Sequence, residues 1–339
     1  MAYITLNKNN FFNNLDIIAK QTKAKDKIAL VLKDNAYGHG ILEVAQMASE
    51  YGLSKCVVQT CEEARKVEQF FEYILVLADF PQEVCTNARY TINELDAIAK
   101  FPAGTKVELK VDTGMHRNGI SPDELYTAFA RIKEHSLLLE GIFTHHRSAD
   151  ELTSEWYWQK ENFKKVKNHA NLLVEEFGFS KLRFHSSNSA ALFRETSFDE
   201  DIARVGIVAY GCMDLPKPLA VEGFKSVLSV WAKRLSSRKL TIGQKVGYGA
   251  TFRADEESRV STYDFGYGDG FFRIIAQNNY VTPKGVKIAG RISMDNSSFL
   301  SDEDELLIFD DARMVAQYAN TISYEVLTSL KKQIPRKIV

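Results

Sequence analysis

The sequence of 339 residues lacks long apolar runs and any excess of one charge, and it has little cysteine. Its longest uninterrupted apolar run, Tyr73–Ala78, has six residues, whereas a membrane-spanning helix needs about 18 or more. The first ten residues are mostly polar and hold no apolar signal core. We therefore expect a soluble, cytoplasmic protein that does not bind membranes.

The charges nearly cancel, because 43 Lys and Arg face 44 Asp and Glu for a net charge of −1. Proteins that bind nucleic acid usually carry a basic excess, so we expect no nucleic-acid partner. Cys56, Cys61, Cys85 and Cys212 are too few and too scattered for a disulfide framework or a zinc site. We expect all four to be reduced and the protein to bind no metal. The length predicts two domains.

The first two thirds of the chain alternate between short apolar segments and helical patterns such as Ile41–Tyr51 and 154–177. Eight strands in succession predict a (β/α)8 TIM-type barrel. A doubly wound open sheet is the alternative, but no Gly-x-Gly-x-x-Gly motif follows the first strand. The expected strands are 28–32, 55–59, 73–78, 90–92, 106–111, 138–144, 182–185 and 202–208.

The pattern changes after Leu215, where Pro216 and Pro218 interrupt the chain and runs rich in Val, Ser, Thr, Tyr and Gly follow. Such runs predict a mostly β domain. We expect a barrel over 1–216, with the first few residues pairing with the second domain, and a mainly β domain over 217–339. The expected strands of this domain are 226–231, 245–252, 260–265, 285–293 and 305–309, and a closing helix is expected over 323–330.

Five polar clusters follow or overlap the predicted barrel strands at their carboxyl ends, where barrel enzymes build their active sites. The seventh and eighth strands are accompanied by Ser and Gly residues, which suit phosphate binding. Lys33, at the end of the first strand, could be a solvated charge, a phosphate partner or a covalent nucleophile. The residues alone leave these three roles open. The clusters are 33–40, 110–119, 144–150, 185–191 and 204–207.

The segment Lys33–Gly40 (KDNAYGHG) resembles the pyridoxal-phosphate (PLP) lysine motif of bacterial alanine racemases. Further motifs of that family recur in the same order, so the resemblance covers nearly the whole chain. It implies a PLP-binding barrel followed by a β domain, and a homodimer whose active sites are shared between subunits. The further motifs are 110–117 (KVDTGMHR), 188–191 (NSAA), 204–207 (RVGI), 246–250 (VGYGA), 266–270 (GYGDG) and 290–295 (GRISMD).

The resemblance implies a two-base interconversion of L-alanine and D-alanine that supplies D-alanine for peptidoglycan. Lys33 would hold PLP covalently and act as one base, and Tyr248 of the partner subunit would be the other. His145 matches the partner of that tyrosine and would be linked onward to Arg204. Arg204 matches the arginine at the pyridine nitrogen of PLP, where it can only donate.

The remaining matched residues surround the cofactor and the substrate. Arg117 and Met294 of the partner subunit match contacts to the substrate carboxylate. Lys110 matches a lysine that is carbamylated in some members, where the carbamate would orient Arg117. The phosphate and cofactor contacts match Tyr37, Asn188, Ser189, Gly206, Ile207 and Tyr324, and the substrate entrance matches Tyr267 and Asp295.

One departure from the family pattern is Asp34, which replaces the small residue that usually follows the PLP lysine. We expect its side chain to face away from Lys33, because neighbouring residues in a strand point to opposite sides. A serine or broad-specificity amino-acid racemase is the nearest alternative function. Two other classes are less consistent with the sequence. A PLP decarboxylase lacks the Tyr248 motif. A PLP carrier would need only a barrel and not a second domain of about 120 residues.

Overall fold

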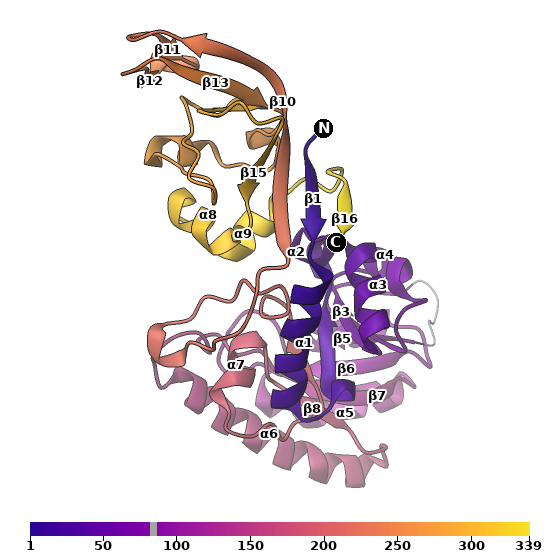
Figure 1. The fold of residues 1–339 in the computed structure, drawn as a ribbon. Helices are drawn as coiled ribbons and strands as arrows, with labels where there is room; N and C mark the ends of the chain where they lie inside the picture. Colours follow the sequence, from indigo (N-terminus) through magenta and orange to yellow (C-terminus); the bar gives the residue numbers. More distant parts are fainter. Residues whose placement is uncertain (82–86) are drawn as a thin grey trace.

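The computed structural model describes residues 1–81 and 87–339 of the chain. The first part forms a barrel of eight parallel strands, the lower lobe of Figure 1, which confirms the predicted fold. The strands are hydrogen-bonded in the order β8-β7-β6-β5-β4-β3-β2-β9. They are β2 (Ile28–Val31), β3 (Lys55–Val58), β4 (Tyr73–Val76), β5 (Ala88–Ile92), β6 (Lys106–Lys110), β7 (Leu138–Phe143), β8 (Arg183–His185) and β9 (Ala203–Val205).

The barrel is nearly closed between its two edge strands, β8 and β9. Main-chain hydrogen bonds beside these strands join them, from Asp201 N to Phe184 O (3.2 Å) and from Arg204 N to Ser187 O (3.0 Å). Strands β2 and β4 are buried along their whole length. Parallel strands covered by helices have no side that faces water, which explains why they appear as short continuous apolar runs.

Helices cover the outside of the barrel, and local signals set their ends. Helix α3 begins after Gly40 and ends at Gly52, which adopts a left-handed conformation, and its Val44 and Ala48 face the core. Its bounds are those predicted, and α6 begins one residue later than predicted. The helices of this lobe are α1 (Lys8–Thr22), α2 (Lys33–Tyr37), α3 (Ile41–Tyr51), α4 (Cys61–Val67), α5 (Leu125–Glu134), α6 (Glu155–Phe177) and α7 (Ser189–Arg194).

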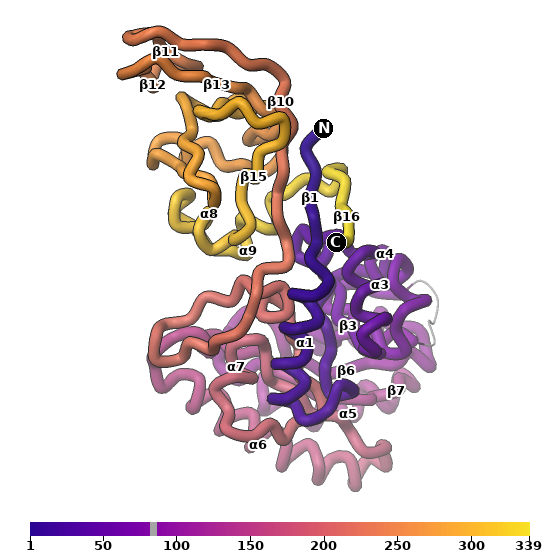
Figure 2. Tube along the Cα trace, in the orientation of Figure 1, coloured from indigo at the N-terminus to yellow at the C-terminus, as the bar shows by residue number. Residues whose placement is uncertain are grey.

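The rest of the chain forms a mostly β lobe around a second sheet, the upper lobe of Figure 1. Strand β1 near the N-terminus joins this sheet, antiparallel to β10 and parallel to β16, so the two ends of the chain lie near each other (Figure 2). The sheet order is β14-β13-β10-β1-β16, and β15 also pairs with β10. The elements are β1 (Tyr3–Leu6), β10 (Leu228–Leu240), β11 (Lys245–Val246), β12 (Phe252–Arg253), β13 (Ser258–Tyr263), β14 (Ser297–Phe299), β15 (Glu305–Phe309), α8 (Ala312–Ala319), α9 (Ser323–Thr328) and β16 (Arg336–Ile338).

Three elements of the upper lobe differ from the prediction. The predicted strand 245–252 forms only the short strands β11 and β12, because a 3-10 turn over Tyr248–Ala250 and the positive φ of Gly247 (74°) interrupt it. Strand β10 has 13 residues and runs well beyond the predicted 226–231, because its outer half is exposed and no longer alternates apolar with polar residues. No strand forms over the predicted 285–293, where only isolated bridges occur. Gly285 and Gly290 have φ values of 80°, which an extended strand does not accommodate.

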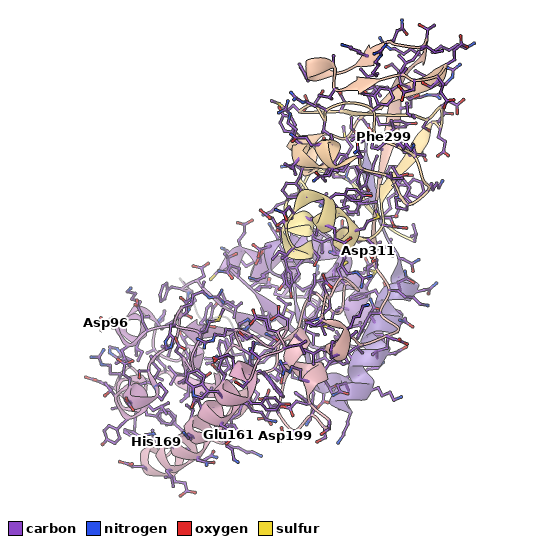
Figure 3. All side chains as sticks on the ribbon, turned by 90° about the vertical axis from the view of Figure 1, so that its left-hand side faces the viewer. Asp96, Glu161, His169, Asp199, Phe299 and Asp311 are labelled. Atoms are coloured by element: carbon purple, nitrogen blue, oxygen red, sulfur yellow. The ribbon has the colours of Figure 1, made fainter. Side chains whose placement is uncertain are left out.

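Aromatic side chains fill the core of the upper lobe, where the ring of Phe299 packs edge-on against Tyr263 at 6.0 Å (Figure 3). Short 3-10 helices link the elements of both lobes. They are η1 (Lys25–Lys27), η2 (Leu95–Lys100), η3 (Pro122–Glu124), η4 (Lys217–Leu219), η5 (Tyr248–Ala250), η6 (Tyr267–Asp269) and η7 (Arg273–Asn278).

Three of the cysteines, Cys56, Cys61 and Cys212, are free thiols, and the prediction for Cys85 falls outside the described residues. Within the described part of the chain, every helix is too short or too polar to cross a bilayer.

Candidate active site

Polar side chains from five loops and strand ends meet at the carboxyl ends of the barrel strands. Lys33 follows β2, Lys110 ends β6, His145 follows β7, Ser189 follows β8, and Arg204 lies in β9. The predicted barrel residues therefore share one mouth, as expected for parallel strands that end on the same side.

Lys33 does not sit in a strand but begins the short helix α2. The next four residues, Asp34 to Tyr37, have φ values of 55°, 57°, 54° and 49°, a left-handed turn that residues other than glycine rarely adopt. The turn brings an Asp34 carboxylate oxygen to 3.7 Å from the Lys33 amine. The prediction that Asp34 faces away is wrong, because the alternation of a strand does not apply to this turn.

Tyr37, Ser189 and Gly206 form a compact group beside that turn. The Tyr37 ring is buried, with its centroid 5.7 Å from those of Tyr210 and Tyr324. The Gly206 N–H donates to Ser189 Oγ at 3.0 Å. A Cβ on Gly206 would lie only 2.9 Å from the Tyr37 ring, so any side chain here would require the ring to shift. The hydroxyl groups of Tyr37 and Ser189 are donors suited to a phosphate, and the missing Cβ leaves the main chain at Gly206 approachable.

Asn188 and Ile207, which were also predicted to contact the phosphate or the cofactor, have different surroundings. Asn188 caps helix α7, with its side-chain oxygen accepting from Ala191 N at 2.9 Å, so that oxygen is committed to the protein. Ile207 is buried, with 2% of its surface exposed. Its main chain lies between the N–H groups of Gly206 and Val208, which donate to the same Ser189 hydroxyl at 3.0 Å and 3.5 Å.

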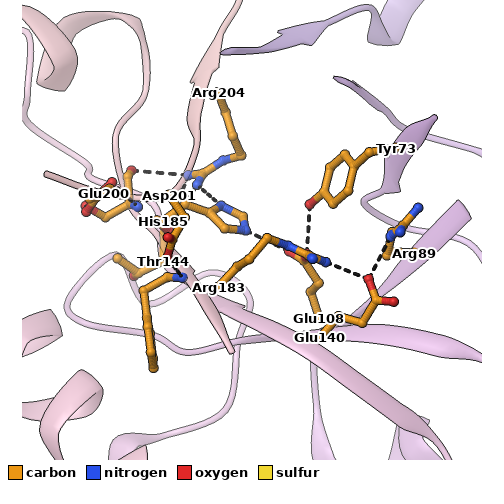
Figure 4. A network of polar contacts seen from close by, with 12 residues as sticks. Tyr73, Arg89, Glu108, Glu140, Thr144, Arg183, His185, Glu200, Asp201 and Arg204 are labelled. Carbon is orange, nitrogen blue, oxygen red and sulfur yellow. Dashed lines mark hydrogen bonds and ion pairs between the residues drawn. The ribbon is translucent and has the colours of Figure 1, made fainter. Parts of the chain in front are cut away.

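Arg204 is buried and held by four hydrogen bonds (Figure 4). Its Nη1 donates to Nδ1 (2.6 Å) and to the carbonyl (3.1 Å) of His185. Its Nη2 donates to the carbonyls of Thr144 (2.6 Å) and Ser186 (3.2 Å). The Nε–H has no acceptor among the described residues, which leaves one donor of a permanently charged group for a ligand.

The predicted link from His145 to Arg204 is not a hydrogen bond in the described residues. Arg204 binds the ring of His185 instead, since His185 ends β8 beside β9, whereas His145 follows β7. Burial lowers the pKa of His145 well below its usual value, and the Arg204 and Lys110 charges lower it further. The His145 ring is therefore neutral and can accept a hydrogen bond.

Positive charge is concentrated around Lys110. Burial, followed by the charges of Arg117, Arg204 and Lys33, lowers the pKa of Lys110 to about 8. Arg117 is exposed. A cluster of cations with few nearby carboxylates favours an anionic ligand or an anionic modification.

Of the residues predicted in the second domain, Tyr324 lies against Tyr37 at the barrel mouth, whereas Tyr248, Met294 and Asp295 lie together elsewhere in the upper lobe. Tyr248 lies between β11 and β12, at the end of the upper lobe away from the barrel (Figure 1). A surface cavity of about 620 Å³ is lined by Tyr248, Met294, Asp295 and their neighbours. Tyr248 and Met294 are 65% and 57% exposed, and Tyr267 is 41% exposed. Within one chain, Tyr248 therefore does not join Lys33.

Comparison with known proteins decides the family. The model of the alanine racemase N-terminal domain matches residues 6–214, and that of the alanine racemase C-terminal domain matches residues 227–338. The chain belongs to the alanine racemase family. It is 44% identical over 336 residues to an alanine racemase from a Nitratiruptor species, and the match covers 99% of each sequence.

Solved structures of the alanine racemase family have the same fold. The alanine racemase of Clostridium difficile 630 is 26% identical with a TM-score of 0.88, and the match covers 100% of this chain and 95% of that one. The alanine racemase of Bacillus anthracis with bound L-Ala-P is 26% identical with a TM-score of 0.85, at the same coverage.

Two residues at the site were missed in the sequence, His185 and Glu108. The cluster that begins at His185 was recognised for its serines and not for the imidazole. Glu108 lies in β6, where charged and apolar residues alternate, so no local signal in the sequence marks it as buried. The described residues contain no group of three or more His, Cys, Asp or Glu side chains arranged to hold a metal.

Proposed function

We propose that the protein catalyses the interconversion of L-alanine and D-alanine with PLP as its cofactor. The observation that carries the proposal is the convergence, at one barrel mouth, of a lysine amine, a phosphate-type cradle and an arginine N–H without a protein acceptor. Full-length similarity to alanine racemases supports alanine as the substrate. No observation favours the alternative of a serine or broad-specificity racemase.

The groups at the barrel mouth match the three functional parts of PLP. Lys33 would bind the aldehyde carbon, and the Nε–H of Arg204 would donate to the pyridine nitrogen. When bound, PLP withdraws electrons from the substrate Cα and so makes its proton removable. The phosphate would be held by Tyr37, Ser189, Tyr324, the main chain of Gly206 and Ile207, and the helix turn capped by Asn188.

Racemisation needs one group on each face of the substrate Cα, so that a proton leaves one face and another returns to the opposite face. Lys33 would serve one face. We propose Tyr248 of the partner subunit for the other, because the tyrosine is exposed and distant from Lys33 within one chain. The active unit would then be a homodimer with shared sites. A phenol has a pKa of about 10, so nearby cations and the neutral His145 ring would be needed to favour its proton transfer.

Arg117 and the main chain of Met294 of the partner subunit would bind the substrate carboxylate, with Tyr267 and Asp295 of the partner subunit lining the entrance. We further propose that Lys110 carries a carbamate, which would give Arg117 an anionic partner. Carbamylation requires a neutral amine. With a pKa of about 8, roughly a tenth of Lys110 is neutral at pH 7, against about one in 2,500 for an ordinary lysine.

Two further expectations belong to this proposal. We propose that the barrel and the β domain divide near residue 216, between the two matched family regions. The supply of D-alanine for peptidoglycan and a location in the cytoplasm stay predictions.

The test is to add PLP to the purified protein, record its visible absorbance, and measure D-alanine formed from L-alanine. We expect a visible band and formation of D-alanine. Absence of the band would overturn the assignment of PLP. A band without exchange of the α-hydrogen would instead indicate a PLP carrier.

A further inference from the structure

We propose that Glu108 is a positioning residue, which fixes the tautomer of His185 and thereby the orientation of the Arg204 guanidinium. The first step depends only on this chain. The second step, toward the pyridine nitrogen, rests on the proposed function.

Glu108 is a fully buried carboxylate inside the barrel, on β6. Its Oε2 accepts from His185 Nε2 at 2.6 Å, and its Oε1 accepts from the Tyr73 hydroxyl at 2.8 Å and from Arg183 Nη2 at 3.1 Å (Figure 4). Burial opposes the charged form, but the interactions with His185 and Arg183 outweigh it and lower the pKa of Glu108 to about 2. The side chain is therefore ionised at neutral pH and can only accept hydrogen bonds.

The two ring nitrogens of His185 face partners of opposite kinds. Nε2 faces the Glu108 carboxylate, which only accepts, and Nδ1 faces Arg204 Nη1 at 2.6 Å, which only donates. One ring form satisfies both contacts, the neutral tautomer with its proton on Nε2. Burial lowers the pKa of His185, in agreement with a neutral ring.

Phe143 stacks on the ring, with the ring centroids 4.9 Å apart and an interplanar angle of 6°, and so holds its plane. A half-turn within that plane would place carbon atoms opposite Glu108 and Arg204 and would lose both hydrogen bonds. A change of hydrogen bonding at Nε2 must therefore appear as a change of tautomer. With the proton on Nδ1, two donors would face each other across the contact to Arg204 Nη1. The guanidinium would then have to move.

Such a movement would affect the ligand through the Nε–H of Arg204, the one N–H of this side chain that is not hydrogen-bonded to the described residues. The four recorded hydrogen bonds of Nη1 and Nη2 fix the plane of the guanidinium and so the direction of its Nε–H. The bond to His185 Nδ1 is one of the two shortest of the four. Glu108 therefore acts on the site from the far side of His185, without touching substrate or cofactor.

Glu108→Gln is the informative substitution, because the two carboxylate oxygens have unequal demands. Oε1 receives two donors, from Tyr73 and Arg183, so the amide oxygen of glutamine belongs there. The amide NH2 then faces His185 Nε2 and requires an acceptor, which moves the ring proton to Nδ1. Glu140→Gln is the matched control, since Glu140 accepts from Arg183 and Arg89 but does not contact His185.

The first readout is the nitrogen-15 NMR spectrum of histidine-labelled protein without cofactor, at neutral pH. The protein has seven histidines, and a His185→Gln sample assigns the signals of His185. We expect a protonated Nε2 and a bare Nδ1 in the wild type and in Glu140→Gln, and the reverse in Glu108→Gln. A wild-type ring protonated on Nδ1 overturns the proposal without any variant, so a misfolded Glu108→Gln protein would not leave it undecided.

The second readout is the kinetics of the PLP-loaded protein. We expect Glu108→Gln to lower kcat about tenfold, at the lower end of the losses seen when hydrogen-bond partners behind metal-binding histidines are removed, with little change in KM for alanine. The absorption maximum of the bound cofactor should shift as well. Reversal of the tautomer with unchanged kcat and absorption would overturn the step to Arg204. A wild type that binds no PLP or forms no D-alanine would overturn the proposed function, while the tautomer measurement would still decide the first step.

Discussion

Substitution of Gly206 by alanine tests whether the phosphate of PLP lies against Tyr37. The new Cβ would lie 2.9 Å from Tyr37 Cε2, 3.0 Å from its hydroxyl oxygen and 3.1 Å from Cζ. Ordinary contacts begin near 3.4 Å, so the ring must retreat by roughly 0.5 Å. Tyr210 and Tyr324 flank the ring and restrict that movement.

The size of the effect follows from the cost of overpacking, about 1–3 kcal/mol. We expect the phenol to relax toward the phosphate site in the protein without cofactor, and bound PLP would block that movement. The cost therefore falls mainly on binding, and we expect the Kd for PLP to rise about 5- to 150-fold. Titration of the visible absorbance with PLP measures this change.

The control for Gly206→Ala is Gly104→Ala, in a loop where a Cβ would meet nothing within 4 Å. Its φ of 79° makes alanine costly for folding there, so we expect a lower Tm with an unchanged Kd for PLP. A Gly206→Ala protein that folds and binds PLP as tightly as the wild type would refute the placement of the phosphate.

Three further predictions follow from the same site. Tyr248→Phe should lower kcat at least 100-fold, the lower bound of a typical general acid–base contribution, and most strongly in the direction that starts from L-alanine. Mixing Tyr248→Phe subunits with Lys33→Ala subunits should restore part of the activity. Mixed dimers without any activity would contradict the shared site. Carbon-13 bicarbonate should produce a carbamate NMR signal that Lys110→Arg abolishes, whereas a bare amine in the wild type would contradict the modification. The pKa of Glu108 is about 2 in the folded protein against ~4.3 in the unfolded chain, so the folded state binds fewer protons. The resulting stabilisation of the fold, at most about 3 kcal/mol, is lost as the pH falls from about 5 to 2. Denaturant titrations of Glu108→Gln should show a smaller loss of stability over this pH range, and an unchanged loss would contradict the prediction.

Much of the fold could be predicted because local patterns report which side of an element is buried. The eight short apolar segments between helical patterns match β2 to β9, since strands buried on both sides leave a continuous apolar run. The turn at Gly285 and the exposed half of β10 were not predicted, because neither has an alternating pattern. Helix α8 and strands β14 and β16 were not predicted either.

The sequence by itself determined which residues gather at the barrel mouth, because parallel strands all end on one side and each polar cluster follows a strand. Only the tertiary structure decided which of these side chains contact each other. Glu108 meets His185 across 77 positions of sequence, a pairing set by the arrangement of strands in the barrel and not by any local pattern. Asp34 turns toward Lys33 because of a left-handed backbone that spacing does not reveal. Tyr248 lies exposed and far from Lys33, since the long strand β10 carries it to the outer end of the second lobe.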